Sequence, residues 1–124
     1  GATLARAVEE ALDAAGADTV VEFGAGSGAL AAQLLGALGD RVRHYRIVEL
    51  SAPLRQRQRE RLAAWGGRVE WLEAWPEAMH AVVVGNEVLD AMPVTLLHFD
   101  GARWFERGVA LQGEALAWAD RPTD

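Results

Sequence analysis

The chain of 124 residues contains no cysteine and no lysine, and its apolar runs are far shorter than the roughly 20 residues that span a bilayer. Without cysteine it can form no disulfide, thiolate metal site or cysteine nucleophile, so its chemistry must come from carboxylates, amides or histidines. A formal net charge of −6 disfavours nucleic acid as a partner, because phosphate binding needs a concentrated basic surface. No membrane segment or secretory signal is recognisable, so a cytoplasmic or organellar protein is expected.

Apolar spacing predicts alternating helices and strands over residues 1–85. An opening helix is expected at 4–15, with Thr3 as its N-cap and Gly16 at its end. Helices are also predicted at 30–38 and 51–65, the second with Ser51 as N-cap and Pro53 in its first turn. Strands are predicted at 19–23, 44–50, 68–72 and 81–85, the last of them fully buried. This alternation indicates a parallel sheet.

The pattern changes after Pro93. Two strand-like runs, at 94–99 and 102–111, flank Asp100-Gly101, which is a strong signal for a tight hairpin. A second turn at 112–114 precedes a run at 115–119, and residues 120–124 are interpreted as a polar tail. The predicted fold class is α/β, a Rossmann-like parallel sheet followed by an antiparallel meander. Residues 1–124 are expected to form one cofactor-binding domain of a longer protein.

The stretch TVVEFGAGSGA, residues 19–29, predicts a ligand-binding loop between a strand and a helix. Gly24, Gly26 and Gly28 lack a Cβ, so the backbone can turn with positive φ and approach a bulky ligand. Glu22 places a negative charge at the end of the strand, which suits a cationic or amino-bearing ligand and opposes a pyrophosphate. This favours S-adenosylmethionine over a dinucleotide.

Three other polar segments follow predicted strands, and ligands of open parallel sheets bind at that edge. Glu49 lies at the distance beyond the glycines where a carboxylate can accept hydrogen bonds from both ribose hydroxyls, or it is a helix-entry carboxylate favoured by the helix dipole. Glu73 either reaches an adenine amino group or faces solvent. Asn86, with Glu87 and Asp90, either faces the transferred methyl group or caps a short helix. We expect Glu22, Glu49 and Asn86 to share one pocket.

Two other groups are interpreted as structural. The arginines at 55, 57, 59 and 61 spread around a helix, so a solvated helix is expected in place of a nucleic-acid groove. His44, His80 and His98 lack ligand-like spacing, so no metal site is expected.

The segments VEFGAGSGALA, IVELSAPLRQRQRERL, GNEVLDAMPV and WFERGV together resemble the MidA-like S-adenosylmethionine-dependent methyltransferases. The mitochondrial members of that family methylate an arginine of a respiratory complex I subunit. The resemblance implies a methyltransferase of protein arginine, in bacterial cytoplasm or the mitochondrial matrix, with S-adenosylmethionine as cofactor. It implies that cofactor-binding positions are Glu22, Gly24, Ala25, Gly26, Gly28, Glu49, Leu50, Glu73, Ala74 and Asn86.

For the acceptor, the resemblance points to Asn86, Glu87 and Asp90 as catalytic positions. A protonated guanidinium needs a carboxylate that grips it and helps it lose a proton, and Glu87 is the first candidate for that role. Two other functions stay open. The loop also fits the loose dinucleotide pattern, which would make the chain part of an NAD-binding oxidoreductase, and the short chain is also compatible with a non-catalytic scaffold. The oligomeric state is not indicated.

Overall fold

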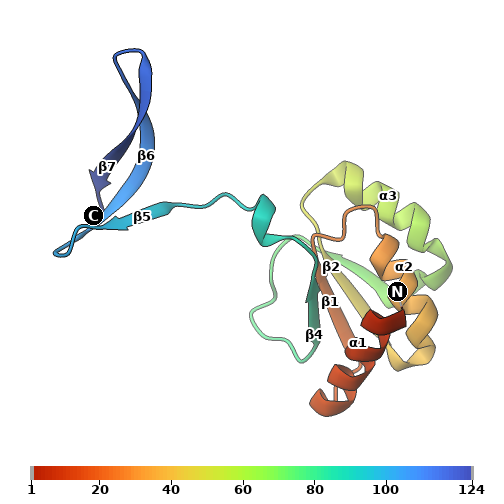
Figure 1. Ribbon diagram of the computed structural model, residues 1–124. Coiled ribbons are helices and arrows are strands. Elements are labelled where there is room, and N and C mark those ends of the chain that lie inside the picture. Colours follow the sequence, from red (N-terminus) through yellow and green to blue (C-terminus); the bar gives the residue numbers. More distant parts are fainter. Residues whose placement is uncertain (1, 124) are drawn as a thin grey trace. The chain divides into compact units, whose positions relative to one another are not determined.

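The computed structural model describes residues 2–123 and divides the chain into two compact units, Gly1–Val88 and Leu89–Asp124. The first unit contains helices and a parallel sheet, and the second contains an antiparallel sheet (Figure 1). Each unit is described separately below.

The first unit is a four-stranded parallel sheet in the order β3-β2-β1-β4, with β1 and β2 in the interior. The helix α1 contacts α2, and α2 contacts α3, so the helices form a layer beside the sheet (Figure 1). The elements in chain order are α1 Ala2–Ala15, β1 Thr19–Phe23, α2 Ala29–Leu38, a 3-10 turn Gly39–Arg41, β2 His44–Val48, α3 Ala52–Leu62, a 3-10 segment Ala63–Arg68, β3 Val69–Leu72 and β4 Val82–Gly85.

The core of this unit lies between the inner strands and the helices. Val20 and Ile47 are fully buried in β1 and β2, and Leu12 and Leu34 cover them from α1 and α2. Burying such a side chain contributes about 1.5–3 kcal/mol. The parallel Rossmann-like arrangement predicted from the sequence is therefore confirmed, and β1 has the predicted bounds.

Two local predictions for this unit were wrong. Thr3 lies inside α1, which begins at Ala2, so it is not the N-cap. The strand β4 is not fully buried, because it is an edge strand among the described residues, and the Val83 side chain is 51% exposed. The arginine helix is solvated as predicted at Arg57, Arg59 and Arg61, and only Arg55 is partly buried, where it pairs with Glu73.

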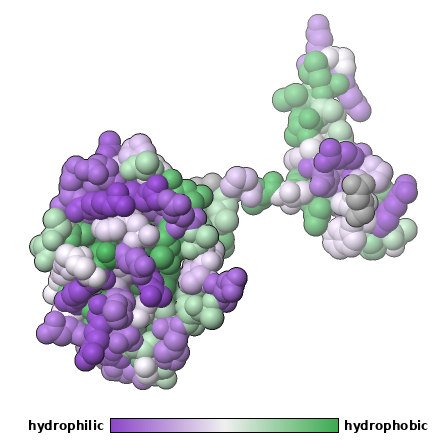
Figure 2. Space-filling view, turned by 180° about the vertical axis from the view of Figure 1, so that it is seen from behind, coloured by the Kyte–Doolittle hydropathy of each residue, from purple (hydrophilic) through white to green (hydrophobic). Residues whose placement is uncertain are grey.

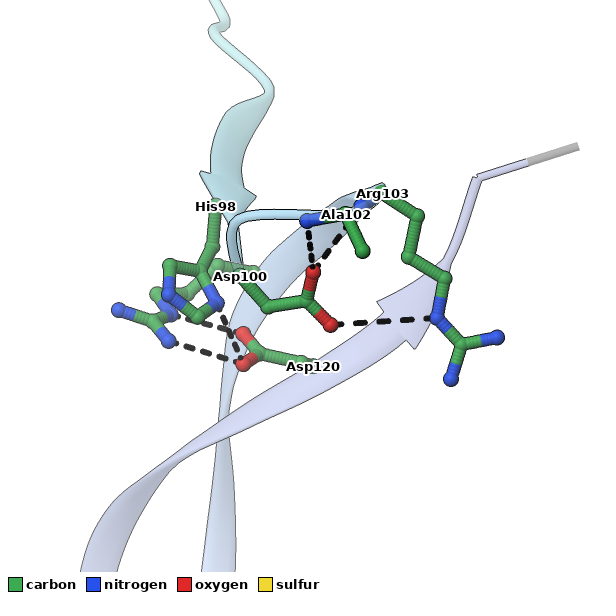
Figure 3. Close-up of polar contacts among 6 residues, drawn as sticks. His98, Asp100, Ala102, Arg103 and Asp120 are labelled. Carbon is green, nitrogen blue, oxygen red and sulfur yellow. Dashed lines mark hydrogen bonds and ion pairs between the residues drawn. The ribbon is translucent and has the colours of Figure 1, made fainter.

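The second unit is the predicted antiparallel meander, in the order β5-β6-β7. Its elements are a 3-10 turn Leu89–Ala91, β5 Leu96–Phe99, β6 Trp104–Gln112 and β7 Ala115–Pro122. Asp100 closes the first hairpin by accepting hydrogen bonds from the amides of Ala102 and Arg103, at 2.8 and 2.9 Å (Figure 3). The predicted polar tail was wrong in part, since β7 continues to Pro122, opposite Phe105.

This three-stranded sheet has apolar side chains exposed on both faces. Trp104 lies on one face and Trp118 on the other, and both are more than half exposed. Apolar side chains are visible over the surface of β6 and β7 (Figure 2). The described residues of this unit form no α-helix that could cover the sheet, so the unit does not bury these groups by itself. None of the described helices has the length and apolar character needed to cross a membrane.

A polar cluster joins the three strands of the second unit (Figure 3). Asp120 accepts two hydrogen bonds from the Arg107 guanidinium, at 2.7 and 2.8 Å, and its second oxygen lies 2.9 Å from Nδ1 of His98. Arg107 and Asp120 are directly opposite in the β6–β7 register, where an ion pair stabilises strand pairing. The hydrogen bond from Arg107 is the main reason that the pKa of Asp120 falls from 3.8 to about 2.

The lowered pKa of Asp120 predicts how the stability of this sheet depends on pH. A carboxyl whose pKa is lower in the folded state adds stability above its unfolded pKa, and the contribution is lost as the pH falls through the folded value. An Asp120→Asn variant should therefore melt below the wild type at pH 7, and the difference should shrink between about pH 4 and pH 2. Thermal unfolding at a series of pH values measures it; a difference that is constant over this range would contradict the prediction.

Candidate functional site

A pocket of about 390 Å³ lies over the carboxyl end of β1, between α1, α2 and the loop of residues 24–28, which we call the glycine loop. It brings together four positions predicted from the sequence, Glu22, Gly24, Ala25 and Asn86. The described lining residues are Leu4, Glu22, Gly24, Ala25, Ser27, Ala29, Leu30, Gln33 and Asn86. None of these side chains is basic. Among the described lining residues, Glu22 and Asn86 share this pocket as expected, but Glu49 does not line it. The other predicted positions that do not line it are Gly26, Gly28, Leu50, Glu73, Ala74, Glu87 and Asp90.

Glu22 is the one charged side chain among the described residues that line this pocket. It is the next-to-last residue of the buried β1 strand and is only 2% exposed. The hydroxyl of the fully buried Tyr45, on β2, donates a 2.7 Å hydrogen bond to its Oε2. Burial raises the pKa of Glu22 above its ordinary 4.5, and the Tyr45 bond offsets part of that effect. A buried carboxylate of this kind is most stable beside a positively charged group.

The glycine loop requires glycine at two of its positions for different reasons. Gly24 has φ +70°, and a Cβ built there would lie 2.9 Å from Cγ2 of Val88. The loop can therefore approach the Val88 side chain this closely only with glycine at position 24. Gly26 has φ +53°, and a Cβ there would meet no protein atom within 4 Å. A position that is both in the left-handed region and open to solvent suits close approach of a ligand to the backbone.

Glu49 lies just beyond β2 and is held at both oxygens by the protein. The amide of Ser51 donates to Oε1 at 2.9 Å, and Nε2 of Gln58 donates to Oε2 at 3.3 Å. The same Gln58 nitrogen donates to the carbonyl of Gly26 at 2.9 Å. Glu49 is therefore fixed beside the glycine loop through Gln58. The N-cap role predicted for Ser51 is confirmed, since its hydroxyl accepts from the amide of Leu54 at 3.5 Å.

Glu73 is exposed and paired with Arg55. The Arg55 guanidinium donates to Oε1 of Glu73 at 2.7 Å, and this hydrogen bond lowers the pKa of Glu73. The tryptophans on either side behave differently. The indole of Trp71 points to Gln58, whereas Trp75 stacks on Phe23 with ring centroids 5.4 Å apart.

The segment after β4 does not form the short helix capped by Asn86 that was the structural alternative for it. Asn86 reaches the pocket, and Glu87 is exposed and has φ +51°. Among the described residues Glu87 is the only non-glycine with positive φ. Such strain costs of order 1 kcal/mol, and it is often found at functional sites. Asp90 lies in the 3-10 turn Leu89–Ala91 of the second unit.

Sequence reasoning missed two contributions to the site. One is the wall of the pocket formed by Leu4 of α1 and by Leu30 and Gln33 of α2. The other is Gln58, which is fully buried and hydrogen-bonded to three other segments. A signal for Gln58 did exist in the sequence, because it stands midway between Leu54 and Leu62 at helical spacing, on the face expected to be buried. No group of three or more acidic or histidine side chains in residues 2–123 is placed to hold a metal ion.

Residues 3–124 match the family described as "Putative S-adenosyl-L-methionine-dependent methyltransferase". Two crystal structures of proteins from Burkholderia thailandensis are similar to the chain, each with 53% sequence identity over 98% of the chain and a TM-score of 0.75. One of them is bound to S-adenosyl-homocysteine. The chain spans about a third of the length of these proteins, 33% and 34% respectively. No curated protein matches it.

Proposed function

The chain belongs to a family of S-adenosyl-L-methionine-dependent methyltransferases, and from that premise we propose that it binds S-adenosylmethionine at the carboxyl edge of β1 and β2. The observation that carries the proposal is the chemistry of the pocket. It has one buried carboxylate, Glu22, and no basic side chain among its described lining residues. Such a pocket favours an ammonium or sulfonium group and opposes a pyrophosphate. The related complex with S-adenosyl-homocysteine supports the same choice of ligand.

The residues around the loop fit the parts of this ligand. We assign the methionine end to Glu22, Gly24 and Ala25, whose pocket also offers the Ser27 hydroxyl and the Gln33 amide as donors. Gly26 and Gly28 of the same loop are assigned to it as positions where the backbone can approach the ligand. We assign the ribose to Glu49, because a carboxylate can accept hydrogen bonds from two neighbouring hydroxyls. The adenine is assigned to the segment after β3 and to Leu50, with Glu73 and Ala74 as its contacts.

For the reaction, S-adenosylmethionine supplies a methyl carbon that an acceptor nitrogen attacks in line as the carbon–sulfur bond breaks, leaving S-adenosylhomocysteine. The work of the chain is to align the acceptor and exclude water, which can contribute several kcal/mol. We propose that Asn86 and Glu87 face the acceptor, whereas the catalytic role of Asp90, which lies in the second unit, stays a prediction from the sequence. The exposed Glu87 carboxylate at a strained position could hold a guanidinium and take up its proton. A protein arginine is accordingly the proposed acceptor.

Calorimetric titration tests the ligand assignment. The chain should bind S-adenosylmethionine and S-adenosylhomocysteine and should not bind NAD at comparable concentrations. Binding of NAD without either adenosyl ligand would overturn the proposal and restore the oxidoreductase alternative. Binding without methyl transfer to any acceptor would favour the scaffold alternative.

The acceptor assignment needs a separate experiment. A Glu87→Gln variant should bind S-adenosylhomocysteine like the wild type but transfer methyl groups to arginine-containing peptides at least about tenfold more slowly. Mass spectrometry of the peptides identifies the methylated residue. Methylation of a residue other than arginine, or full activity of the variant, would contradict this assignment.

A further inference from the structure

We propose that Gln58 is a positioning residue that sets the ribose selectivity of the site by fixing Glu49 against the glycine loop. This inference rests on the ligand assignment above. Gln58 lies on α3 and is 0% exposed, although an amide side chain is costly to bury unless its hydrogen bonds are made. It makes them to three segments, namely the glycine loop, the connection between β2 and α3, and β3.

The orientation of the Gln58 amide follows from Trp71. The indole N–H of Trp71 donates to Oε1 of Gln58 at 2.8 Å, and an indole can only donate. The carbonyl end of the amide is thereby committed to β3, and the NH₂ end must face the other way. Its two hydrogens reach the carbonyl of Gly26 at 2.9 Å and Oε2 of Glu49 at 3.3 Å.

Packing holds Gln58 in this place as well. A Cβ built at Gly28 would lie 3.3 Å from Cγ of Gln58, so glycine at that position lets α3 approach the loop. The Arg59 guanidinium lies 5.2 Å from the ring centre of Trp71 and adds a cation–π contact to the same indole. Gln58 therefore has little freedom to turn away from Glu49.

The consequence for the ligand concerns the ribose hydroxyls. Ser51 and Gln58 each donate to one oxygen of Glu49, which fixes the plane of the carboxylate and leaves a further lone pair on each oxygen. A carboxylate held in one orientation by supporting hydrogen bonds binds two hydroxyls better than a mobile one. Loss of Gln58 should weaken binding most for ligands that carry those hydroxyls, because its other bond, to the Gly26 carbonyl, supports the loop for either kind of ligand.

The test compares two ligands on two proteins. Wild type and Gln58→Met are titrated with S-adenosylhomocysteine and with its 2′,3′-dideoxy analogue. The preference of the wild type for the hydroxylated ligand should fall about tenfold in the variant, the value of one hydrogen bond to a charged group. Affinity for the dideoxy analogue should change less than about threefold, because that ligand makes no contact that Glu49 could lose.

Two further measurements separate positioning from general damage. The Trp71 indole N–H resonance should move in Gln58→Met, which lacks its acceptor. It should stay in Gln56→Leu, a matched change on the exposed side of α3, where the Gln56 amide donates to Oε1 of Glu60 at 2.8 Å. Gln56→Leu should also keep the wild-type preference between the two ligands.

A second variant covers the case in which Gln58→Met does not fold. Gln58→Glu keeps the volume and the acceptor for Trp71 but turns a carboxylate toward Glu49. Its preference for the hydroxylated ligand, relative to wild type, should be lost at pH 8 and partly recovered at pH 5.5. Burial and the facing Glu49 carboxylate raise the pKa of the new carboxyl, so at the lower pH it is partly protonated and can donate again. Equal weakening toward both ligands, or an unchanged preference, would overturn the inference. Failure of the wild type to bind either ligand would instead overturn the proposed function.

Discussion

A Glu22→Gln variant is expected to bind S-adenosylmethionine about 100-fold more weakly than the wild type, because loss of a buried charge that pairs with a ligand cation costs roughly 2–5 kcal/mol. The same variant should melt at the wild-type temperature or higher at pH 7. Glutamine keeps an acceptor for the Tyr45 hydroxyl, and it removes a carboxylate that is 2% exposed and costly to desolvate. Opposite effects on binding and stability would mark Glu22 as a functional residue.

The pH dependence of that stability difference has a definite sign. The pKa of Glu22 is raised in the folded state above its ordinary 4.5, so folding favours the protonated form. The charge therefore costs nothing below about pH 4.5, and its cost appears as the pH rises through the folded pKa. The melting temperatures of wild type and Glu22→Gln should converge at pH 4 and separate at pH 7.

A matched control for Glu22 is Glu70→Gln on β3. Glu70 is an exposed carboxylate that pairs with Arg46 at 3.0 Å and does not line the pocket. It should change neither the affinity for S-adenosylmethionine nor, by more than a few tenths of a kcal/mol, the stability. If Glu22→Gln bound the ligand with wild-type affinity, the assignment of the pocket to the methionine end would be wrong.

The sequence predicted those features that local chemistry decides. The strand at Thr19–Phe23 is a β-branched run that ends at a glycine loop, and Ser51 before Pro53 is a helix start, so both could be located without the fold. The features it did not predict depend on which elements meet. The exposure of Val83 follows from the place of β4 at the edge of the described sheet, which the sequence of one strand does not contain.

Gln58 shows the same limit within a single helix. The α3 sequence APLRQRQRERL is polar on nearly every side, so its buried face has no apolar stripe beyond Leu54 and Leu62. What buries Gln58 is the set of partners from the glycine loop and β3, which are distant in the chain. Likewise, Leu4 joins the pocket only because α1 packs against α2, and no motif marks it.

The glycine loop gives the second large effect, a loss of stability at Gly24. A Gly24→Ala variant places a methyl group 2.9 Å from Cγ2 of Val88 and holds alanine at φ +70°. Overpacking costs about 1–3 kcal/mol and the left-handed backbone about 1–2 kcal/mol, so a loss of roughly 2–5 kcal/mol is expected. Denaturant unfolding measures it, and a Val88→Ala second change should recover part of the loss by making room.

Gly26→Ala should affect binding more than stability, and Gly39 supplies the matched control. The two glycines have φ +53° and +51°, and an added Cβ meets no protein atom within 4 Å at either position. Gly26→Ala should lose about 1–2 kcal/mol of stability. Gly39→Ala should lose at least as much, because its ψ of −129° lies outside the left-handed helical region. Only Gly26→Ala should weaken S-adenosylmethionine binding, by about tenfold or more, because its methyl group occupies space that the ligand needs. Equal affinity of the two variants would mean that the ligand does not approach the loop at Gly26, and the loop would then be a turn that serves the fold alone.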